Sequence, residues 1–189
     1  YGVRTIVDLR NVEEHDVDPP PYGTNTAPDA VPRYLSVPLF DLDDGETLAR
    51  LDWTRSRYGD SYCALLDGFR RNVAAILRAV VGAPDGGVLI HCHAGKDRTG
   101  VVVAVLLALA GVPKDTIVAD YALSQRVLWP RWEVDRGEAP TLPPPHAPPE
   151  AMAAVLDWLA REHGGAEGYA RAIGLDDAEI ERLRERLVE

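Results

Sequence analysis

The sequence of 189 residues predicts a single α/β domain with three layers, in which helices flank a mainly parallel central sheet. Two observations carry this prediction. Short β-branched or apolar segments alternate with longer segments of helical periodicity, which is the order expected when strands pair in parallel. No internal repeat interrupts this alternation, so a solenoid is not indicated. Further helical segments near the C-terminus predict additional helices beyond the sheet.

Two strands are expected in the first forty residues. The segment Val3–Leu9 is short and β-branched, and the polar residues 10–14 that follow are typical of a strand that leads into a helix. Residues 16–32 are rich in proline and polar residues and indicate an irregular surface loop. Arg33–Leu39 then provides the second strand.

The middle of the chain combines an irregular segment with a long amphipathic one. Residues 41–60 are polar, with Trp53 and Tyr58 as aromatic interruptions, and show no clear period, so we interpret them as a lid. From Ser61 to Val81, apolar residues recur at steps of three and four, which predicts one amphipathic helix.

A third strand and a series of helices complete the domain. Val88–His91 is a short apolar run, typical of a strand that is covered on both faces. The helical segments that follow are Thr99–Ala110, Lys114–Leu128, Pro149–His163 and Asp176–Glu189. Residues 137–149 are rich in proline and predict a surface connection.

Composition excludes some classes of function. The net charge is −10, so a general electrostatic attachment to nucleic acid or to an anionic membrane is not expected. The longest apolar run, residues 101–112, is well short of the roughly 20 residues that span a bilayer. The two cysteines, Cys63 and Cys92, are too few for a disulfide framework and indicate a reducing compartment. We expect a cytoplasmic protein, but export stays open because the sequence starts at Tyr1 and an upstream segment is expected to be missing.

The chemistry is concentrated in residues 91–100, which read His-Cys-His-Ala-Gly-Lys-Asp-Arg-Thr-Gly. They lie between the third predicted strand and the most apolar helix. In parallel sheets, ligands bind at the carboxyl ends of the strands, where the next helix begins with unpaired N–H groups and a positive dipole end. The sequence therefore predicts an anion-binding loop.

Individual residues of this loop suit phosphate chemistry. The five residues between Cys92 and Arg98 can direct their amides toward a tetrahedral dianion, and the planar guanidinium can bind two of its oxygens at once. Gly95 permits a tight bend with positive φ. The same amides favour negative charge on the Cys92 sulfur, which makes it a nucleophile, and Thr99 would place a hydroxyl beside it.

The string Cys-x5-Arg-Thr preceded by His resembles the signature of the protein tyrosine phosphatase superfamily, in particular a bacterial branch that acts on phosphoproteins and phosphoinositides. Further similarity lies in residues 2–10, 37–39, 119–124, 168–169 and 173–175. The resemblance implies a tyrosine-phosphatase-like fold and hydrolysis of phosphotyrosine, and of phosphoserine, phosphothreonine or phosphoinositides, through a phosphocysteine. It implies no metal and no cofactor. The residues implied are Cys92, Arg98 and Asp97 for catalysis and His93, Ala94, Gly95, Lys96 and Thr99 for substrate binding.

Three carboxylates are candidates for the general acid. Asp97 lies within the loop and resembles the residue to which this branch assigns the role, and we favour it because an acid must reach the leaving group. Asp41 follows the second strand, where small dual-specificity phosphatases keep their acid, and Asp8 is a weaker third choice. In much of the superfamily a Trp-Pro-Asp loop supplies the acid, but residues 129–131 read Trp-Pro-Arg and lack the carboxylate.

Rival interpretations of the same residues are weaker. A pseudophosphatase that binds phosphorylated partners without turnover is the main alternative, and a persulfide carrier is another. His91, Cys92 and His93 suggest zinc, but adjacent strand residues point to opposite faces and no second ligand pair has the right spacing. A nucleotide-binding loop is excluded because Asp97 stands where Ser or Thr is required. The oligomeric state is not indicated.

Overall fold

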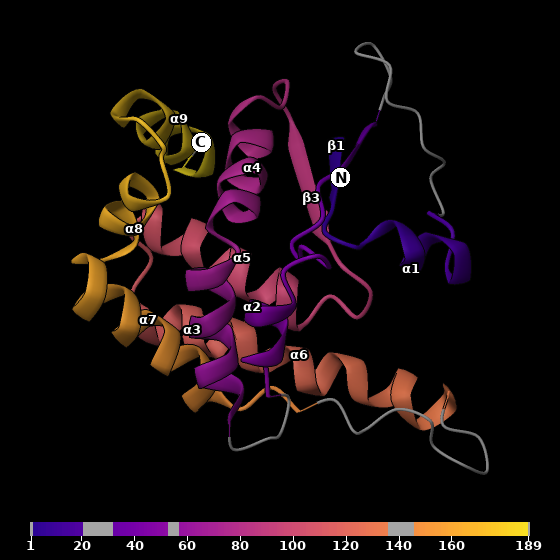
Figure 1. The fold of residues 1–189 in the computed structure, drawn as a ribbon. Coiled ribbons are helices and arrows are strands. Elements are labelled where there is room, and N and C mark those ends of the chain that lie inside the picture. Colours follow the sequence, from indigo (N-terminus) through magenta and orange to yellow (C-terminus); the bar gives the residue numbers. More distant parts are fainter. Residues whose placement is uncertain (1, 21–31, 53–56, 136–145, 189) are drawn as a thin grey trace.

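A three-stranded parallel sheet lies at the centre of the fold (Figure 1). The computed structural model describes residues 2–20, 32–52, 57–135 and 146–188. The sheet has the order β2-β1-β3, and β1 pairs in parallel with both neighbours. Its strands are β1 (Val3–Asp8), β2 (Arg33–Ser36) and β3 (Gly87–His91). The predicted parallel sheet is confirmed.

Helices flank this sheet. Most of them gather on one side of it, whereas α1 lies on the opposite side (Figure 1). The prediction of an α/β fold with additional C-terminal helices is therefore confirmed. The helices are α1 (Val12–Val17), α2 (Gly45–Ala49), α3 (Tyr58–Gly68), α4 (Arg70–Val81), α5 (Asp97–Leu109), α6 (Lys114–Asp135), α7 (Pro149–His163), α8 (Ala166–Ala172) and α9 (Asp177–Val188).

The hydrophobic core is built around α5. This helix packs against α6, α7, α8 and α9 as well as β3. Its residues Val101, Val102 and Val105 are fully buried, as the uninterrupted apolar sequence leads one to expect. In the part of the chain that the structure describes, no helix combines the length and apolar character needed to cross a membrane. The core thus fixes the start of α5 against the end of β3.

The helix predicted over residues 61–81 is wrong in one respect, because the structure divides it into α3 and α4. Phe69 between them has φ −92° and ψ 37°, outside the helical region. The break turns the Phe69 ring inward, where it is 2% exposed and its centroid is 5.6 Å from that of Phe40. Apolar periodicity continues across the break and therefore conceals it from the sequence.

Other boundaries also differ from the sequence expectation. α6 continues past Leu128 through the exposed Pro130, which has no N–H to donate to the carbonyl four residues earlier. α8 was not predicted, because its seven residues are bounded by glycines. It is stabilised by tertiary contact: the buried Tyr169 hydroxyl donates to the Leu66 carbonyl at 2.7 Å.

The two segments given special roles from the sequence are partly described. Residues 41–60 contain α2 and the first turn of α3, and residues 53–56, with Trp53, lie outside the described residues. Of residues 137–149, only 146–149 are described, and Pro149 starts α7. The lid and the surface connection remain predictions.

Candidate active site

The loop after β3 holds Cys92 at the carboxyl edge of the sheet. Cys92 is 7% exposed, whereas His93, Ala94 and Gly95 are exposed. Gly95 has φ +71°, a conformation that side chains with a Cβ rarely adopt, and α5 begins two residues later. The free N–H groups of the first helical turn therefore face the same loop as the sulfur.

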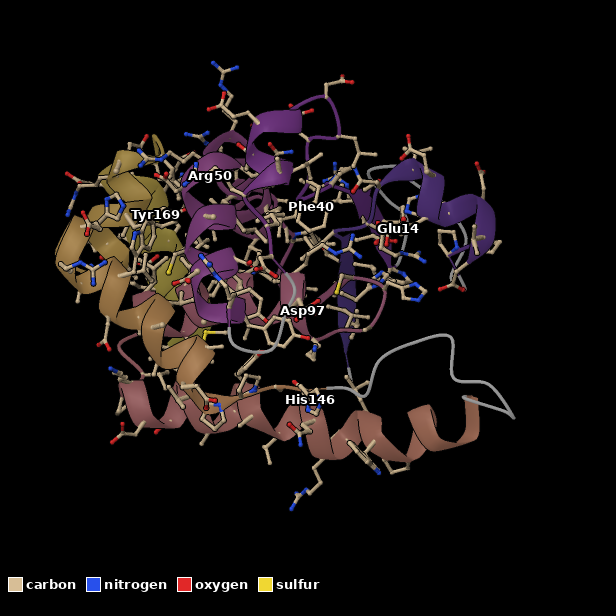
Figure 2. The ribbon with its side chains drawn as sticks, turned by 60° about the horizontal axis from the view of Figure 1, so that its bottom comes forward. Glu14, Phe40, Arg50, Asp97, His146 and Tyr169 are labelled. Atoms are coloured by element: carbon tan, nitrogen blue, oxygen red, sulfur yellow. The ribbon has the colours of Figure 1, made fainter. Side chains whose placement is uncertain are left out.

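Arg98 is held by a carboxylate from the opposite side of the sheet. Its two terminal nitrogens donate to Glu14 Oε2 and Oε1 at 2.6 and 2.7 Å. The Arg98 guanidinium also lies 5.1 Å from the centroid of the Phe40 ring. In Figure 2, Glu14 and Phe40 lie on the same side of Asp97. The guanidinium is thus fixed in direction by a two-point hydrogen bond and supported by an aromatic face.

The charges of this pair reinforce each other. Burial works against the charged guanidinium, but hydrogen bonds to Glu14 and the nearby Cys92 outweigh it and raise the pKa of Arg98. Partial burial also works against the Glu14 carboxylate, but Arg98 and the Asn11 N–H hold the pKa of Glu14 below its usual value. Both groups are therefore charged at neutral pH, and Arg98 lies close to Cys92.

Glu14 was not among the predicted site residues, although its position has a local signal in the sequence. The Asn11 backbone N–H donates to Glu14 Oε2 at 2.9 Å, and the Asn11 side chain donates to the Phe40 carbonyl at 3.1 Å. An Asn followed three residues later by Glu is the pattern of a capping box at the start of a helix. That pattern predicts the helix start, but not the contact with Arg98.

Asp97 is held by buried tyrosines that the sequence analysis also missed. The Tyr62 hydroxyl donates to Asp97 Oδ1 at 2.5 Å, and the Tyr121 hydroxyl lies 2.7 Å from that of Tyr62. Lys96 Nζ is 3.4 Å from the same Asp97 oxygen. The Asp97 side chain is 28% exposed, so it keeps contact with solvent at the loop.

Lys96 points into the protein. Its Nζ donates to the His146 carbonyl at 2.6 Å and lies 4.9 Å from the centroid of the Tyr58 ring, and the side chain is 9% exposed. His146 lies between the loop and α6 in Figure 2. The cation thus adds positive charge close to the loop while it joins the loop to the segment before α7.

Comparison with known proteins decides the family. The model of the tyrosine phosphatase family matches residues 1–189. The chain belongs to the tyrosine phosphatase family. The resemblance found from the signature residues is therefore confirmed over the whole sequence.

Two relatives show the range of similarity within this family. The tyrosine-protein phosphatase of Nostoc commune is 31% identical over 98% of this chain and 66% of that protein. The triple specificity protein phosphatase PtpB of Mycobacterium tuberculosis is 32% identical over 51% of this chain and 42% of that protein. The chain thus spans less than two thirds of the length of either relative.

The other carboxylates considered as the acid lie in different settings. Asp41 is exposed, and its Oδ1 accepts a hydrogen bond from the Asp43 N–H at 3.1 Å, which caps a local turn. Asp8 is fully buried. It accepts hydrogen bonds from Arg10 and from the Tyr34 hydroxyl, at 2.7 and 2.8 Å to its Oδ2. These contacts give Asp8 a structural role at the end of β1.

His91 connects this buried ion pair to the signature loop of the tyrosine phosphatase family. Its Nε2 is 3.5 Å from Asp8 Oδ2, and its Nδ1 is 3.2 Å from the Cys92 carbonyl oxygen. His93, by contrast, is exposed, with Nδ1 3.8 Å from Asp18. Within the described ranges, no three His, Cys, Asp or Glu side chains gather as metal ligands would.

Thr99 faces a small cavity behind the loop. Its Oγ1 is buried and makes no hydrogen bond with any described residue, Cys92 included. A cavity of about 100 Å³ lies at this point between α5 and α6, with Gly95, Thr99, Asp120 and Ser124 in its lining. The hydroxyl predicted to lie beside the sulfur is therefore not bonded to it in this structure.

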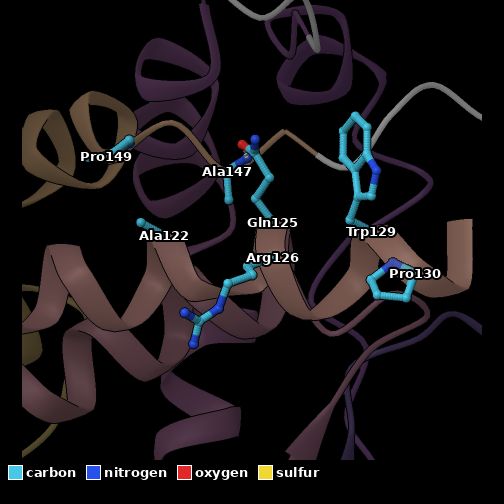
Figure 3. A pocket seen from close by; sticks show the side chains of 7 residues that line it. All are labelled: Ala122, Gln125, Arg126, Trp129, Pro130, Ala147 and Pro149. Carbon is cyan, nitrogen blue, oxygen red and sulfur yellow. Dashed lines mark hydrogen bonds between the residues drawn. The ribbon is translucent and has the colours of Figure 1, made fainter. Parts of the chain in front are cut away.

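A larger cavity, of about 520 Å³, lies between α6 and the segment before α7 (Figure 3). Gln125, Arg126 and Trp129 line it from α6. The Gln125 side chain accepts a hydrogen bond from the Ala147 N–H at 3.2 Å. Residues 129–130, excluded above as an acid loop, thus form a wall of this cavity.

Proposed function

We propose that the protein is a cysteine-dependent phosphatase that hydrolyses phosphotyrosine through a phosphocysteine intermediate. The observation that carries the proposal is the arrangement around Cys92. Its sulfur follows β3, the N-terminal turn of α5 lies beyond it, and Arg98 is held beside it by Glu14. A nucleophile and a fixed phosphate-binding guanidinium thus share one loop.

The reaction follows from these positions. The Cys92 thiolate attacks phosphorus, an S–P bond forms and the P–O bond to the leaving group breaks. Arg98 and the loop amides bind the equatorial oxygens, where charge develops in the transition state. Water then attacks phosphorus, breaks the S–P bond and regenerates the thiolate. Apart from the attacking water and the substrate, every group used belongs to the chain, and no cofactor is part of the proposed steps.

Asp97 is proposed as the general acid. Among the three candidate carboxylates, it alone lies within the loop that carries Cys92, and its side chain is partly exposed there. Asp8 is buried in an ion pair, and Asp41 caps a turn. Asp97 is therefore the carboxylate best placed to protonate the leaving oxygen and then to take a proton from the attacking water.

The substrate class is proposed from the family and from the charge at the loop. Both relatives are named as protein phosphatases, and PtpB is named a triple specificity enzyme. We therefore propose phosphorylated proteins as substrates. Phosphoinositides are a second candidate class, supported by Lys96, a second cation that lies two residues before Arg98 in the same loop and 3.4 Å from Asp97 Oδ1. Both cysteines are free thiols, which supports a reducing, cytoplasmic setting.

A pair of cysteine variants tests this function. Cys92→Ser should abolish turnover of p-nitrophenyl phosphate and of a phosphotyrosine peptide while phosphate still binds. Cys63→Ser is the matched control, because its Sγ faces the Ala154 carbonyl on α7, and it should keep nearly the full rate. Equal loss in both variants would overturn the assignment. Absence of turnover by the unmodified protein, with phosphopeptide binding retained, would favour the pseudophosphatase.

A further inference from the structure

Two buried tyrosine hydroxyls form a hydrogen-bonded chain that ends on Asp97. Tyr62, from α3, is fully buried, and Tyr121, from α6, is 3% exposed. Tyr62 Oη lies 2.5 Å from Asp97 Oδ1 and 2.7 Å from Tyr121 Oη. The reaction proposed above assigns neither tyrosine a task, although both are directed at its acid.

The number of protons available fixes which group donates in each of these hydrogen bonds. A phenol carries one proton, and an ionised carboxylate can only accept. Tyr62 must use its proton to donate to Asp97, so its oxygen accepts from Tyr121. Burial and the neighbouring Asp97 raise the pKa of Tyr62, and burial likewise raises the pKa of Tyr121. Both hydroxyls therefore remain protonated, and both donors point toward the carboxylate.

The two carboxylate oxygens of Asp97 make different contacts. Tyr62 and Lys96 both approach Oδ1, at 2.5 and 3.4 Å. Among the described residues, no hydrogen bond is made to Oδ2. One oxygen is thus anchored in the protein, and the other is left to carry the proton that is transferred.

We propose that Tyr62, supported by Tyr121, is a positioning residue for the general acid. It holds Oδ1 of Asp97 in place, so that Oδ2 can protonate the leaving group. It also stabilises the carboxylate that proton transfer creates. In that step the S–P bond forms, the P–O bond breaks, and the proton passes from Asp97 Oδ2 to the leaving oxygen. The inference rests on the proposed function, with Asp97 as the acid.

The geometry of the rings supports a fixed position for Tyr62. Its ring stacks on that of Tyr58, with centroids 6.0 Å apart and planes within 2°, and meets Tyr121 edge-on at 6.0 Å. Tyr58 in turn faces Lys96. Aromatic packing of this kind restrains both χ angles of Tyr62. The hydroxyl therefore presents its proton to one point in the loop.

The test is the dependence of the rate on the leaving group. Tyr62→Phe keeps the ring and removes the donor. With substrates from p-nitrophenyl phosphate to phenyl and alkyl phosphates, we expect a roughly tenfold loss of kcat for the poor leaving groups. The loss for p-nitrophenyl phosphate, which hardly needs the proton, should be less than about twofold. Tyr121→Phe removes a hydroxyl that lies one hydrogen bond further from Asp97, and it should show the same dependence on the leaving group, but more weakly.

Tyr169→Phe is the matched control for removal of a buried hydroxyl. Tyr169 is also fully buried and donates to the Leu66 carbonyl, but it lies well apart from Asp97 (Figure 2). In this variant, we expect kcat to change by the same factor for every leaving group. A uniform loss in Tyr62→Phe would overturn the inference, because it would show a structural role alone. If Tyr62→Phe does not fold, the trend in Tyr121→Phe decides in the same way.

A double variant separates this inference from the proposed function. In Asp97→Asn, adding Tyr62→Phe should not steepen the leaving-group dependence further, because the acid is already absent. If Asp97→Asn itself shows no such dependence, the acid assignment fails and the inference fails with it. If Asp97→Asn shows the dependence but Tyr62→Phe does not, the proposed function stands and only the inference is overturned.

Discussion

The guanidinium of Arg98 and the carboxylate of Glu14 face each other through two hydrogen bonds of 2.6 and 2.7 Å, although 84 residues separate them in sequence. The pair joins α5 to α1 across the carboxyl edge of the sheet. A guanidinium oriented in this way loses little rotational freedom when phosphate binds, which is the physical meaning of a preorganised site.

Glu14→Gln should lower kcat/KM on p-nitrophenyl phosphate by roughly tenfold, because the neutral amide replaces a charge-assisted two-point contact with a weaker one. The inhibition constant of inorganic phosphate measures how the same substitution affects phosphate binding without turnover. Glu13→Gln removes an exposed charge from the adjacent position and should change neither value. Equal effects of the two variants would show that Glu14 acts only through long-range charge.

Asp97→Asn should slow alkyl phosphates roughly a hundredfold and p-nitrophenyl phosphate far less, because only a poor leaving group needs protonation. Asp41→Asn should slow both classes alike or not at all. Steady-state rates over the two classes measure the difference. If Asp41→Asn shows the leaving-group dependence instead, the acid is Asp41.

Lys96→Ala should reduce hydrolysis of a phosphoinositide more than hydrolysis of a phosphotyrosine peptide, because the headgroup carries additional phosphate charge near the loop. The ratio of kcat/KM values for the two substrates is the measurement. Lys114→Ala removes an exposed lysine that pairs with Asp157 and should leave the ratio unchanged. A ratio equal to that of the unmodified protein would remove the support that Lys96 gives to the lipid class.

Acid should remove the stabilisation that Asp8 provides. Burial works against its charge, but hydrogen bonds from Arg10 and Tyr34 prevail and lower the pKa of Asp8 from 3.8 to about 2. Because the folded-state value is the lower one, the stabilisation is complete above pH 4 and is lost as the pH falls toward 2. It amounts to roughly 2 kcal/mol. In urea unfolding, Asp8→Asn should have a lower free energy of unfolding than the unmodified protein, and this difference should shrink as the pH falls from 4 toward 2. Asp85→Asn, at an exposed site, should show no such difference.

Gly100→Ala should destabilise the protein by about 1–3 kcal/mol through overpacking. A methyl group at this position would lie 2.9 Å from Tyr121 Cδ2, and the Tyr121 ring lies within the chain that ends on Asp97. Thermal unfolding measures the loss. Gly45→Ala, at an open position where α2 starts, has nothing within 4 Å of the new methyl group and should be neutral or slightly stabilising. An unchanged melting temperature in Gly100→Ala would contradict the close approach.

The sequence by itself determined where the loop lies in the chain, and it predicted the chemistry of that loop. Cys92 and Arg98 have five residues between them and lie between an apolar strand and an apolar helix, so local spacing alone predicts an anion-binding loop at the edge of a parallel sheet. The fold class followed in the same way, because strand and helix periodicities are properties of short segments. These predictions needed no knowledge of which distant residues meet.

Only the tertiary structure decided which side chains support the loop. Glu14 reaches Arg98 from α1, and Tyr62 and Tyr121 reach Asp97 from α3 and α6. In the sequence these are an ordinary helix-start glutamate and two core tyrosines, and nothing local distinguishes them. Their roles depend on how α1, α3 and α6 pack around the end of β3. That packing comes from many weak apolar contacts summed over the whole core, so no single motif encodes it.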